Sequence, residues 1–161
     1  MEQNQNSKKN SFSHLAAYSI AVFALALFAA VLLDIFFPFK FFPEPTNRYI
    51  GIVIIIVSTF VLYWAELHGH RFSHKRKKGE VTDSSHLCNG PYCYSRNPKY
   101  IGLGLLLIGL GFVLNSIFVT LAAIVSILVV NFFMVKREES FMTERHGDVY
   151  HGYKKKVKKW L

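Results

Sequence analysis

Residues 100–135 read YIGLGLLLIGLGFVLNSIFVTLAAIVSILVVNFFMV, and no side chain in this stretch is charged. Asn115 and Ser116 divide the stretch into two apolar runs, 100–114 and 116–135. An apolar helix of about 20 residues crosses the hydrocarbon core of a bilayer. Two polar residues suffice for a tight turn, so the stretch predicts an antiparallel helical hairpin in a membrane.

The first arm of this hairpin is short for a membrane span. A helix over residues 100–114 rises about 22 Å, whereas the hydrocarbon core measures about 30 Å. The arm must therefore sit shallow or pair with a neighbour. Its glycines have two explanations, because they let helices approach closely and also let a ligand reach the backbone. They are Gly102, Gly104, Gly109 and Gly111.

Two further runs without charged side chains lie before the hairpin, at residues 15–33 and 49–65. With 161 residues and a 52% hydrophobic composition, the chain has the length of one domain, residues 1–161. We predict an all-α fold, a polytopic membrane bundle of about four transmembrane helices. A secretory signal peptide is the alternative for residues 15–33, but such peptides use apolar cores of only about 7 to 15 residues.

Lysine and arginine are distributed unevenly between the two sides that four spans create. Two precede the first run, seven lie between the second and third, and eight follow the fourth, so 17 of the 19 share one side. The positive-inside rule places that side in the cytoplasm. We therefore expect a multi-pass membrane protein whose termini and active site face the cytoplasm.

The net charge of +9 has the same origin. Basic residues flank the spans instead of alternating with exposed aromatic residues, so we expect contact with anionic membrane lipids and none with nucleic acid. Gly147 permits a turn. After it, residues 148–160 predict a basic amphipathic helix on the cytosolic side that lies on the lipid headgroups.

The loop before the hairpin combines residues suited to binding a polar ligand at the membrane boundary. Pro98 disfavours a helical conformation at Asn97, so we expect the third helix to begin at Pro98. A helix N-terminus presents free N–H groups to anions, and Arg96 can hold a carboxylate with two parallel hydrogen bonds. The structural alternative is that Arg96 contacts lipid phosphate and Tyr100 anchors the helix.

Two adjacent carboxylates, Glu138 and Glu139, follow the fourth apolar run. Carboxylates at an anionic membrane surface are costly unless they are paired or used, so a cation, an amine or a ribose diol would stabilise them. On a continuous helix Asn131 would share a face with Glu138, and Arg145 would lie near that stripe. Neutralisation by Arg137 or Arg145 is the simpler alternative.

The order of these motifs resembles one superfamily of membrane enzymes. The chain contains G-P-Y-x-x-x-R-N-P-x-Y-x-G-x-G from residue 90, the apolar hairpin, and R-E-E-x-x-x-x-x-x-x-G-x-x-Y-x-x-Y-x-x-x-V from residue 137. Over residues 87–157 it is similar to the isoprenylcysteine carboxyl methyltransferases and phospholipid methyltransferases. Several separate elements in one order make this match far more specific than a lone glycine pair.

The resemblance implies an S-adenosylmethionine-dependent methyltransferase with a lipophilic or prenylated acceptor, foremost an isoprenylcysteine-like carboxylate. A phospholipid amine is the alternative, and members acting on isoprenylcysteine often carry histidine in place of Asn97. The cofactor-binding residues that the resemblance implies are Arg96, Asn97, Pro98, Tyr100, Gly102, Gly104, Glu138 and Glu139. Those expected to shape and close the pocket are Arg145, Tyr150 and Tyr153. No side chain is expected to act as a nucleophile.

Other functions find less support in the sequence. A loop rich in histidine and cysteine could bind a metal, but Cys88 and Cys93 are spaced more widely than most zinc pairs, and Lys75 to Lys78 would repel a cation. Because the cytoplasm is a reducing compartment, we expect no disulfide in this loop. Sterol reductases resemble the C-terminal half but have more spans. A non-catalytic membrane adaptor would bind no cofactor. The histidines of this loop are His68, His70, His74 and His86.

Overall fold

The computed structural model describes residues 2–40, 46–77 and 83–160, without the side chains of residues 2–16, 46, 70–77, 86 and 145. Within these ranges the chain is helical and forms no strand, although Lys40 and Ser116 make an isolated antiparallel bridge. The predicted all-α architecture is thus confirmed. The main helices are α1 (Glu2–Phe36), α2 (Thr46–Lys77), α3 (Pro98–Leu114), α4 (Ile117–Val129) and α5 (Lys136–Lys156).

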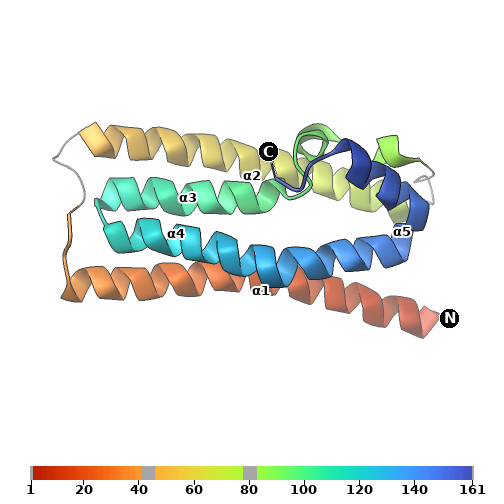
Figure 1. Cartoon of the computed structure of the whole chain (residues 1–161), viewed down its shortest axis with the longest axis horizontal. Helices are drawn as coiled ribbons and strands as arrows, with labels where there is room; N and C mark the ends of the chain where they lie inside the picture. Colours follow the sequence, from red (N-terminus) through yellow and green to blue (C-terminus); the bar gives the residue numbers. More distant parts are fainter. Residues whose placement is uncertain (1, 41–45, 78–82, 161) are drawn as a thin grey trace.

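Helices α1 to α4 run side by side along the long axis of the molecule (Figure 1). Helix α3 packs between α2 and α4, and α1 packs against the other side of α4. Two short 3-10 helices, η1 (Ser84–His86) and η2 (Gly90–Cys93), lie in the connection from α2 to α3. The N-terminus of α3 points toward the end of the molecule where this connection and helix α5 lie.

Three helical segments are long and apolar enough to cross a membrane, namely Ala17–Phe36, Asn47–Gly69 and Ile117–Glu144. Helix α3 is apolar but has only 17 residues. The expected count of four spans is therefore not confirmed, because a helix of the length of α3 falls short of the hydrocarbon thickness.

The predicted helical hairpin is present. Helix α3 begins at Pro98 with Asn97 as its N-cap, and it ends at Asn115, which adopts the left-handed conformation at φ 52°. Such a residue commonly ends a helix, and asparagine tolerates this conformation. Ser116 then caps α4, because its hydroxyl accepts a hydrogen bond from the backbone N–H of Val119.

Glycines of α3 allow close packing on both sides. A Cβ atom at Gly109 would lie 3.1 Å from the carbonyl oxygen of Gly51, so α2 and α3 meet there backbone to backbone. A Cβ at Gly102 would lie 2.7 Å from Cγ of Leu62 in α2. A Cβ at Gly104 would lie 2.5 Å from Cδ1 of Ile127 in α4. Small residues are typical of membrane helix interfaces, and here they form two of them.

The continuous α-helix expected from the fourth run into residues 136–145 is interrupted. Residues Val130–Val135 form η3, a π-helical segment that joins α4 to α5. One extra residue in a turn rotates the following side chains by about 100° relative to an α-helix. The prediction that Asn131 and Glu138 share a face assumed a continuous α-helix, so it does not hold across the π-helical segment.

The C-terminal helix turns back toward the bundle instead of lying apart on the headgroups. Gly147 has φ 50° and ψ −124°, which gives the turn predicted at this position. The residues after it fold over the α2–α3 connection (Figure 1). Tyr150, Tyr153 and Val157 form a buried cluster with Leu87 of that connection. The apolar face of the tail is thus covered by protein, which corrects the expected headgroup location of that face.

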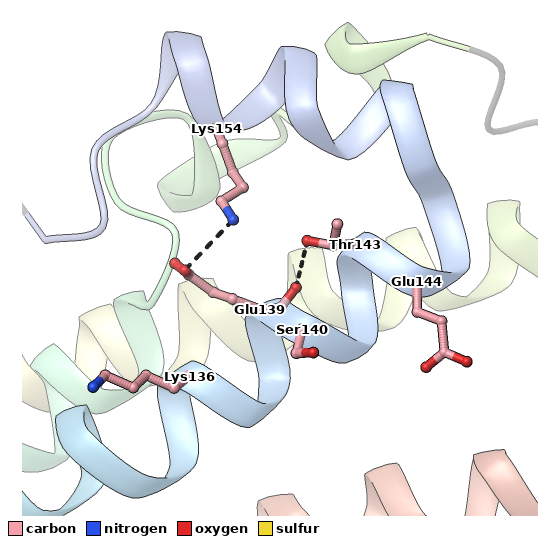
Figure 2. Close-up of a pocket in the computed structure, with 6 residues that line it drawn as sticks. All are labelled: Lys136, Glu139, Ser140, Thr143, Glu144 and Lys154. Atoms are coloured by element: carbon pink, nitrogen blue, oxygen red, sulfur yellow. Dashed lines mark hydrogen bonds and ion pairs between the residues drawn. The ribbon is translucent and has the colours of Figure 1, made fainter.

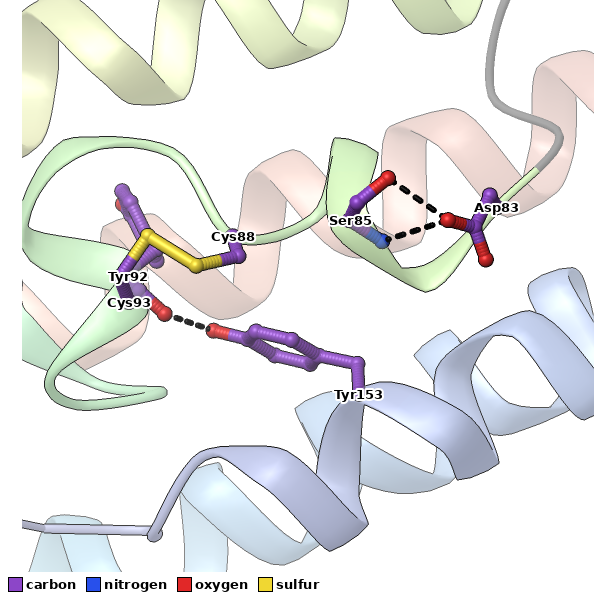
Figure 3. The surroundings of a disulfide bond; sticks show 6 residues. All are labelled: Asp83, Ser85, Cys88, Tyr92, Cys93 and Tyr153. Atoms are coloured by element: carbon purple, nitrogen blue, oxygen red, sulfur yellow. Dashed lines mark hydrogen bonds between the residues drawn. A yellow bond between two sulfur atoms is a disulfide. The ribbon is translucent and has the colours of Figure 1, made fainter.

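The two cysteines of the α2–α3 connection form a disulfide, which corrects a second expectation. Cys88 and Cys93 are joined, with their Cα atoms 4.4 Å apart (Figure 3). The pair spans the short link from η1 to η2, where the chain turns tightly enough to bring residues of this spacing together. The expectation of separate thiols followed from the compartment alone, and it took no account of this turn.

Candidate functional site

A group of polar side chains lies where the N-terminus of α3, the beginning of α5 and the C-terminal tail meet. The hydroxyl of Tyr100 donates a hydrogen bond to Oε1 of Glu138 at 2.5 Å. The neighbouring carboxylate of Glu139 pairs with Arg96 at 3.1 Å and with Lys154 at 3.9 Å. The two adjacent carboxylates therefore turn to different partners, one to a phenol and the other to two cations.

The pair between Arg96 and Glu139 is largely shielded from solvent. Their side chains are 12% and 18% exposed. Nη1 of Arg96 faces Oε1 of Glu139 without hydrogen-bond alignment, and Nε of Arg96 is also buried without a hydrogen-bond partner among the described residues. Buried polar atoms that lack hydrogen bonds are rare in folded proteins. A ligand that carries both kinds of group would supply the hydrogen bonds that these buried atoms lack.

An open groove adjoins this pair. It has a volume of about 490 Å³ and is lined by Lys136, Glu139, Ser140, Thr143, Glu144 and Lys154. Figure 2 shows Glu139 and Lys154 pointing toward one another across it, while the hydroxyl of Thr143 donates to the Glu139 backbone carbonyl at 2.7 Å. Binding sites for small molecules have volumes of about 300 to 1,000 Å³. The groove is thus large enough for a cofactor of nucleoside size.

The tail covers one side of the site through two buried tyrosines. The hydroxyl of Tyr153 donates to the backbone carbonyl of Tyr92 at 2.6 Å, next to the disulfide (Figure 3). Burial raises the pKa of Tyr150 to about 12, and the negative charge of Glu139 acts in the same direction, whereas Arg96 opposes it. Tyr150 therefore remains neutral beside the ion pair at ordinary pH.

Hydrogen bonds to two backbone carbonyls of the tail also hold its end against the loop before α3. The side-chain amide of Asn97 donates to the carbonyl of Lys159 at 3.0 Å, and the hydroxyl of Ser95 donates to the same carbonyl at 3.3 Å. The backbone N–H of Arg96 donates to the carbonyl of Lys158 at 3.1 Å. In this structure the Asn97 side chain thus helps to hold the C-terminal tail against the loop before α3.

The structure brings together most of the residues that the motifs singled out. Around the groove and the ion pair lie Arg96, Tyr100, Glu138, Glu139 and Tyr150. Pro98 begins α3, whereas Gly102 and Gly104 face neighbouring helices, so their expected contact with a cofactor remains a prediction. The Arg145 side chain lies outside the described part of the structure.

Lys154, the second cation beside Glu139, is not among the predicted site residues. It lies in a run of three lysines, whose composition indicates only a basic surface. The signal that could have found it is the spacing of Tyr150 and Tyr153, which marks the face of the tail helix turned toward the site. Without the fold-back at Gly147, nothing in the local pattern links that face to Glu139.

The described side chains of the histidine-rich loop include no candidate group of metal ligands. Among the described residues no group of three or more histidine, cysteine, aspartate and glutamate side chains could hold a metal ion. Nδ1 of His68 lies 2.9 Å from the backbone carbonyl of Trp64. The side chains of His70, His74 and His86 lie outside the described part of the structure.

Comparisons with known proteins bear on the same region. The family model described as phospholipid methyltransferase matches residues 46–149. A protein of Haemophilus influenzae, described as uncharacterized, is 39% identical over 62 residues, which are 38% of this chain and 98% of that protein. No solved structure matches the chain significantly. The matched family region contains α2, the hairpin, the ion pair and the beginning of the tail.

Proposed function

Because the chain belongs to the phospholipid methyltransferase family, we propose that it transfers a methyl group from S-adenosylmethionine to a lipophilic acceptor held in the membrane. The long apolar helices make it a membrane protein. The observation that carries the proposal is the shielded pair of Arg96 and Glu139, whose polar atoms are not fully hydrogen-bonded, at the end of the last long span.

The polar groups of S-adenosylmethionine match the groups that the site offers. Nε and Nη1 of Arg96 can donate to the carboxylate of the methionine part, and Oε1 of Glu139 can accept from an ammonium or a hydroxyl group. The N-terminus of α3 begins two residues after Arg96 and favours negative charge. Glu138, held by Tyr100, would add a second carboxylate that attracts a positively charged cofactor.

The chemistry that the cofactor supplies is a methyl group already activated by the positive sulfur. The protein then needs to bind the cofactor and the acceptor, to orient them, and to exclude water from the site. Arg96 and Glu139 would fix one end of the cofactor, and Tyr150 with the docked tail would shield the site from water. Holding the acceptor atom in line with the methyl group supplies much of the rate enhancement, so no nucleophilic side chain is required.

For the acceptor we propose an isoprenylcysteine-like carboxylate. The ammonium groups of Lys136 and Lys154 line the groove and would attract a carboxylate. A phospholipid amine is the second candidate, because the family carries the phospholipid name and because Glu139 and Glu144 line the same groove. Both acceptors would enter from the bilayer, while the charged cofactor would enter from the aqueous side.

Calorimetry of the detergent-solubilised protein with S-adenosylhomocysteine tests the cofactor. We expect saturable binding, and a protein that binds neither this product nor S-adenosylmethionine would contradict the proposal and favour an adaptor.

Incubation with methyl-labelled S-adenosylmethionine then separates the acceptors. A farnesylated cysteine should yield a methyl ester that releases labelled methanol in alkali, whereas a methylated phosphatidylethanolamine would keep its label under the same treatment. Label retained only in the phospholipid would replace the carboxylate proposal with the amine.

A further inference from the structure

Asn131 is a polar residue inside the last long apolar span, Ile117–Glu144. Its Oδ1 atom is buried and has no hydrogen-bond partner among the described residues, although the residue as a whole is partly exposed. A polar group buried without a hydrogen bond costs free energy, above all in an apolar environment. The fold alone therefore does not account for an unpaired acceptor at this position.

The backbone at Asn131 also departs from regular geometry. The residue lies in η3 (Val130–Val135), the π-helical segment between α4 and α5. Such segments are rare and occur frequently at functional sites. An unpaired side-chain acceptor and an irregular backbone thus coincide at one residue.

Two contacts between the antiparallel helices α3 and α4 locate Asn131 along the bundle. The contacts join Gly111 to Thr120 and Gly104 to Ile127. Seven residues back along α3 thus correspond to seven residues forward along α4, and four further residues in each direction lead to Tyr100 and Asn131. Val130, the neighbour of Asn131, accordingly belongs to the same buried cluster as Tyr100. Asn131 therefore lies at the level of the residue whose phenol binds Glu138.

The depth of Asn131 indicates which ligand could reach it. Asn131 precedes Glu138 by seven residues, a rise of about 10 Å along a helix, so it lies farther from the end that carries α5 and the groove. The charged cofactor would enter at that end, whereas the acceptor would enter from the bilayer. A ligand group that reaches Asn131 is therefore expected to belong to the acceptor.

Both candidate acceptors carry a hydrogen-bond donor of the same kind. A prenylated cysteine has an amide N–H beside its carboxylate, and an ethanolamine phospholipid has N–H groups on the amine itself. An amide oxygen accepts a hydrogen bond from either donor.

We propose that Asn131 is a specificity-determining residue, whose Oδ1 accepts a hydrogen bond from an N–H group of the acceptor. The proposal rests on the proposed function, because it assigns this residue to the acceptor site of that reaction. A compound without the N–H group would leave the buried oxygen unpaired and would bind less tightly.

A second buried asparagine offers a matched control. Oδ1 of Asn47 also lacks a partner among the described residues, but the amide nitrogen of Asn47 donates to the carbonyl of Phe112 at 3.4 Å. This bond joins α2 to α3 near the turn from α3 to α4, away from the groove. Asn47 thus has a bond within the fold to lose, and no contact with the acceptor is expected there.

Thermal unfolding in detergent, without ligand, tests whether the fold needs the amide of Asn131. Leucine has a similar volume and no oxygen to leave unpaired. Asn131→Leu should therefore melt at the parent temperature or up to about 4 °C above it, whereas Asn47→Leu should melt below the parent. A lower melting temperature in Asn131→Leu would show that the amide supports the fold and would overturn the proposal.

Calorimetry without cofactor then compares compounds that differ in their N–H group. One pair is N-acetyl-S-farnesylcysteine and S-farnesylthiopropionic acid, which lacks the amide. The other pair is a short-chain phosphatidylethanolamine and the corresponding phosphatidylcholine. In the parent, the N–H compound of one pair should bind about two- to tenfold more tightly, the equivalent of one hydrogen bond. Asn131→Leu should remove this preference, and Asn47→Leu should keep it.

The two pairs distinguish the sources of the N–H group. A preference lost in the farnesyl pair would support the amide as the donor, and one lost in the lipid pair would support the amine. A preference that survives in Asn131→Leu, or a parent without preference in either pair, would overturn the role of Asn131. A parent that binds no S-adenosylhomocysteine would overturn the proposed function alone, because the comparison of compounds requires no cofactor.

Discussion

At the scale of single residues, the two adjacent carboxylates have separate tasks. Neighbouring residues on a helix point about 100° apart, so Glu138 and Glu139 cannot share one partner. Glu138 is held by Tyr100, and Glu139 faces Arg96 and Lys154. The charge of Glu139 is therefore compensated within the protein. This pairing offsets the free-energy cost that the sequence predicts for unpaired carboxylates at a membrane surface.

The Glu139 carboxylate supplies the first prediction. Glu139→Gln should weaken binding of S-adenosylhomocysteine by about 1 to 3 kcal/mol, because a charge-assisted hydrogen bond to the ligand is lost. Calorimetry measures the change, with Asp148→Asn as a control at an exposed carboxylate outside the groove. Equal affinities of the parent and Glu139→Gln would leave Glu139 as a structural partner of Arg96 only.

The sequence predicted most of these residues and missed others for a physical reason. Arg96, Tyr100 and the carboxylates lie in short motifs beside apolar runs, where the composition changes visibly. Lys154 lies in a run of three lysines, and nothing local distinguishes the one that faces Glu139. Its place depends on the turn at Gly147 and on the docking of the tail, which periodicity does not encode.

At the scale of elements, the ends of α3 were predictable and its surroundings were not. Pro98 and the Asn115–Ser116 turn are local signals, and the structure places the helix ends there. Docking of the tail depends on contacts over long sequence distances. The amide of Asn97, for example, binds the carbonyl of Lys159 62 residues away.

The two helix interfaces of α3 should tolerate substitution differently. In Gly109→Ala the new Cβ would lie 3.1 Å from the Gly51 carbonyl oxygen, which belongs to the backbone and cannot move alone. In Gly104→Ala it would meet the end of the flexible Ile127 side chain. We expect Gly109→Ala to lose about 1 to 3 kcal/mol of stability and Gly104→Ala clearly less.

Thermal unfolding in detergent, without ligand, compares these two variants. Combining Gly104→Ala with Ile127→Val should raise the melting temperature toward the parent value, because valine lacks the Cδ1 methyl group, the closer of the two contacting atoms at 2.5 Å, and keeps only Cγ1 at 2.9 Å. If Gly104→Ala is the more damaging change, the backbone contact between α2 and α3 is not the critical one. If Gly104→Ala folds normally but loses the stabilisation that ligand provides, the expected cofactor contact of this glycine gains support.

Docking of the tail provides a third prediction. Tyr153→Phe removes the hydrogen bond to the carbonyl of Tyr92 and should weaken docking by about 0.5 to 1.5 kcal/mol. Amide hydrogen exchange in residues 148–156 should become faster, while exchange in α2 and α3 should not change. Tyr94→Phe is the matched control, because Tyr94 is 68% exposed. Equal tail exchange in both variants would show that the hydrogen bond contributes nothing to docking.

At the scale of the whole molecule, the polar site and most basic residues gather at one end. Figure 1 shows the N-terminus, the loop with η1 and η2, and α5 toward this end, while the turn from α3 to α4 lies at the other. The same division appears in the sequence, where 17 of 19 lysines and arginines fall on one side of the apolar runs. The fold and the distribution of basic residues thus both place the N-terminus, the α2–α3 connection and α5 on the same side of the membrane-spanning part.

The orientation in the membrane follows as the last prediction. Because basic residues are retained in the cytoplasm, the end with α5 should be cytoplasmic. In a variant with Cys88 and Cys93 replaced by serine, Phe39→Cys should react with an impermeant maleimide in intact cells. Phe39 is 67% exposed, and its ring lies 6.5 Å from that of Phe118, beside the turn from α3 to α4 at the opposite end. Asp148→Cys should react only after permeabilisation, and inside-out vesicles should reverse the pattern. Equal reaction of both variants in intact cells would contradict this orientation and would place the cofactor site away from the cytoplasmic pool that must supply it.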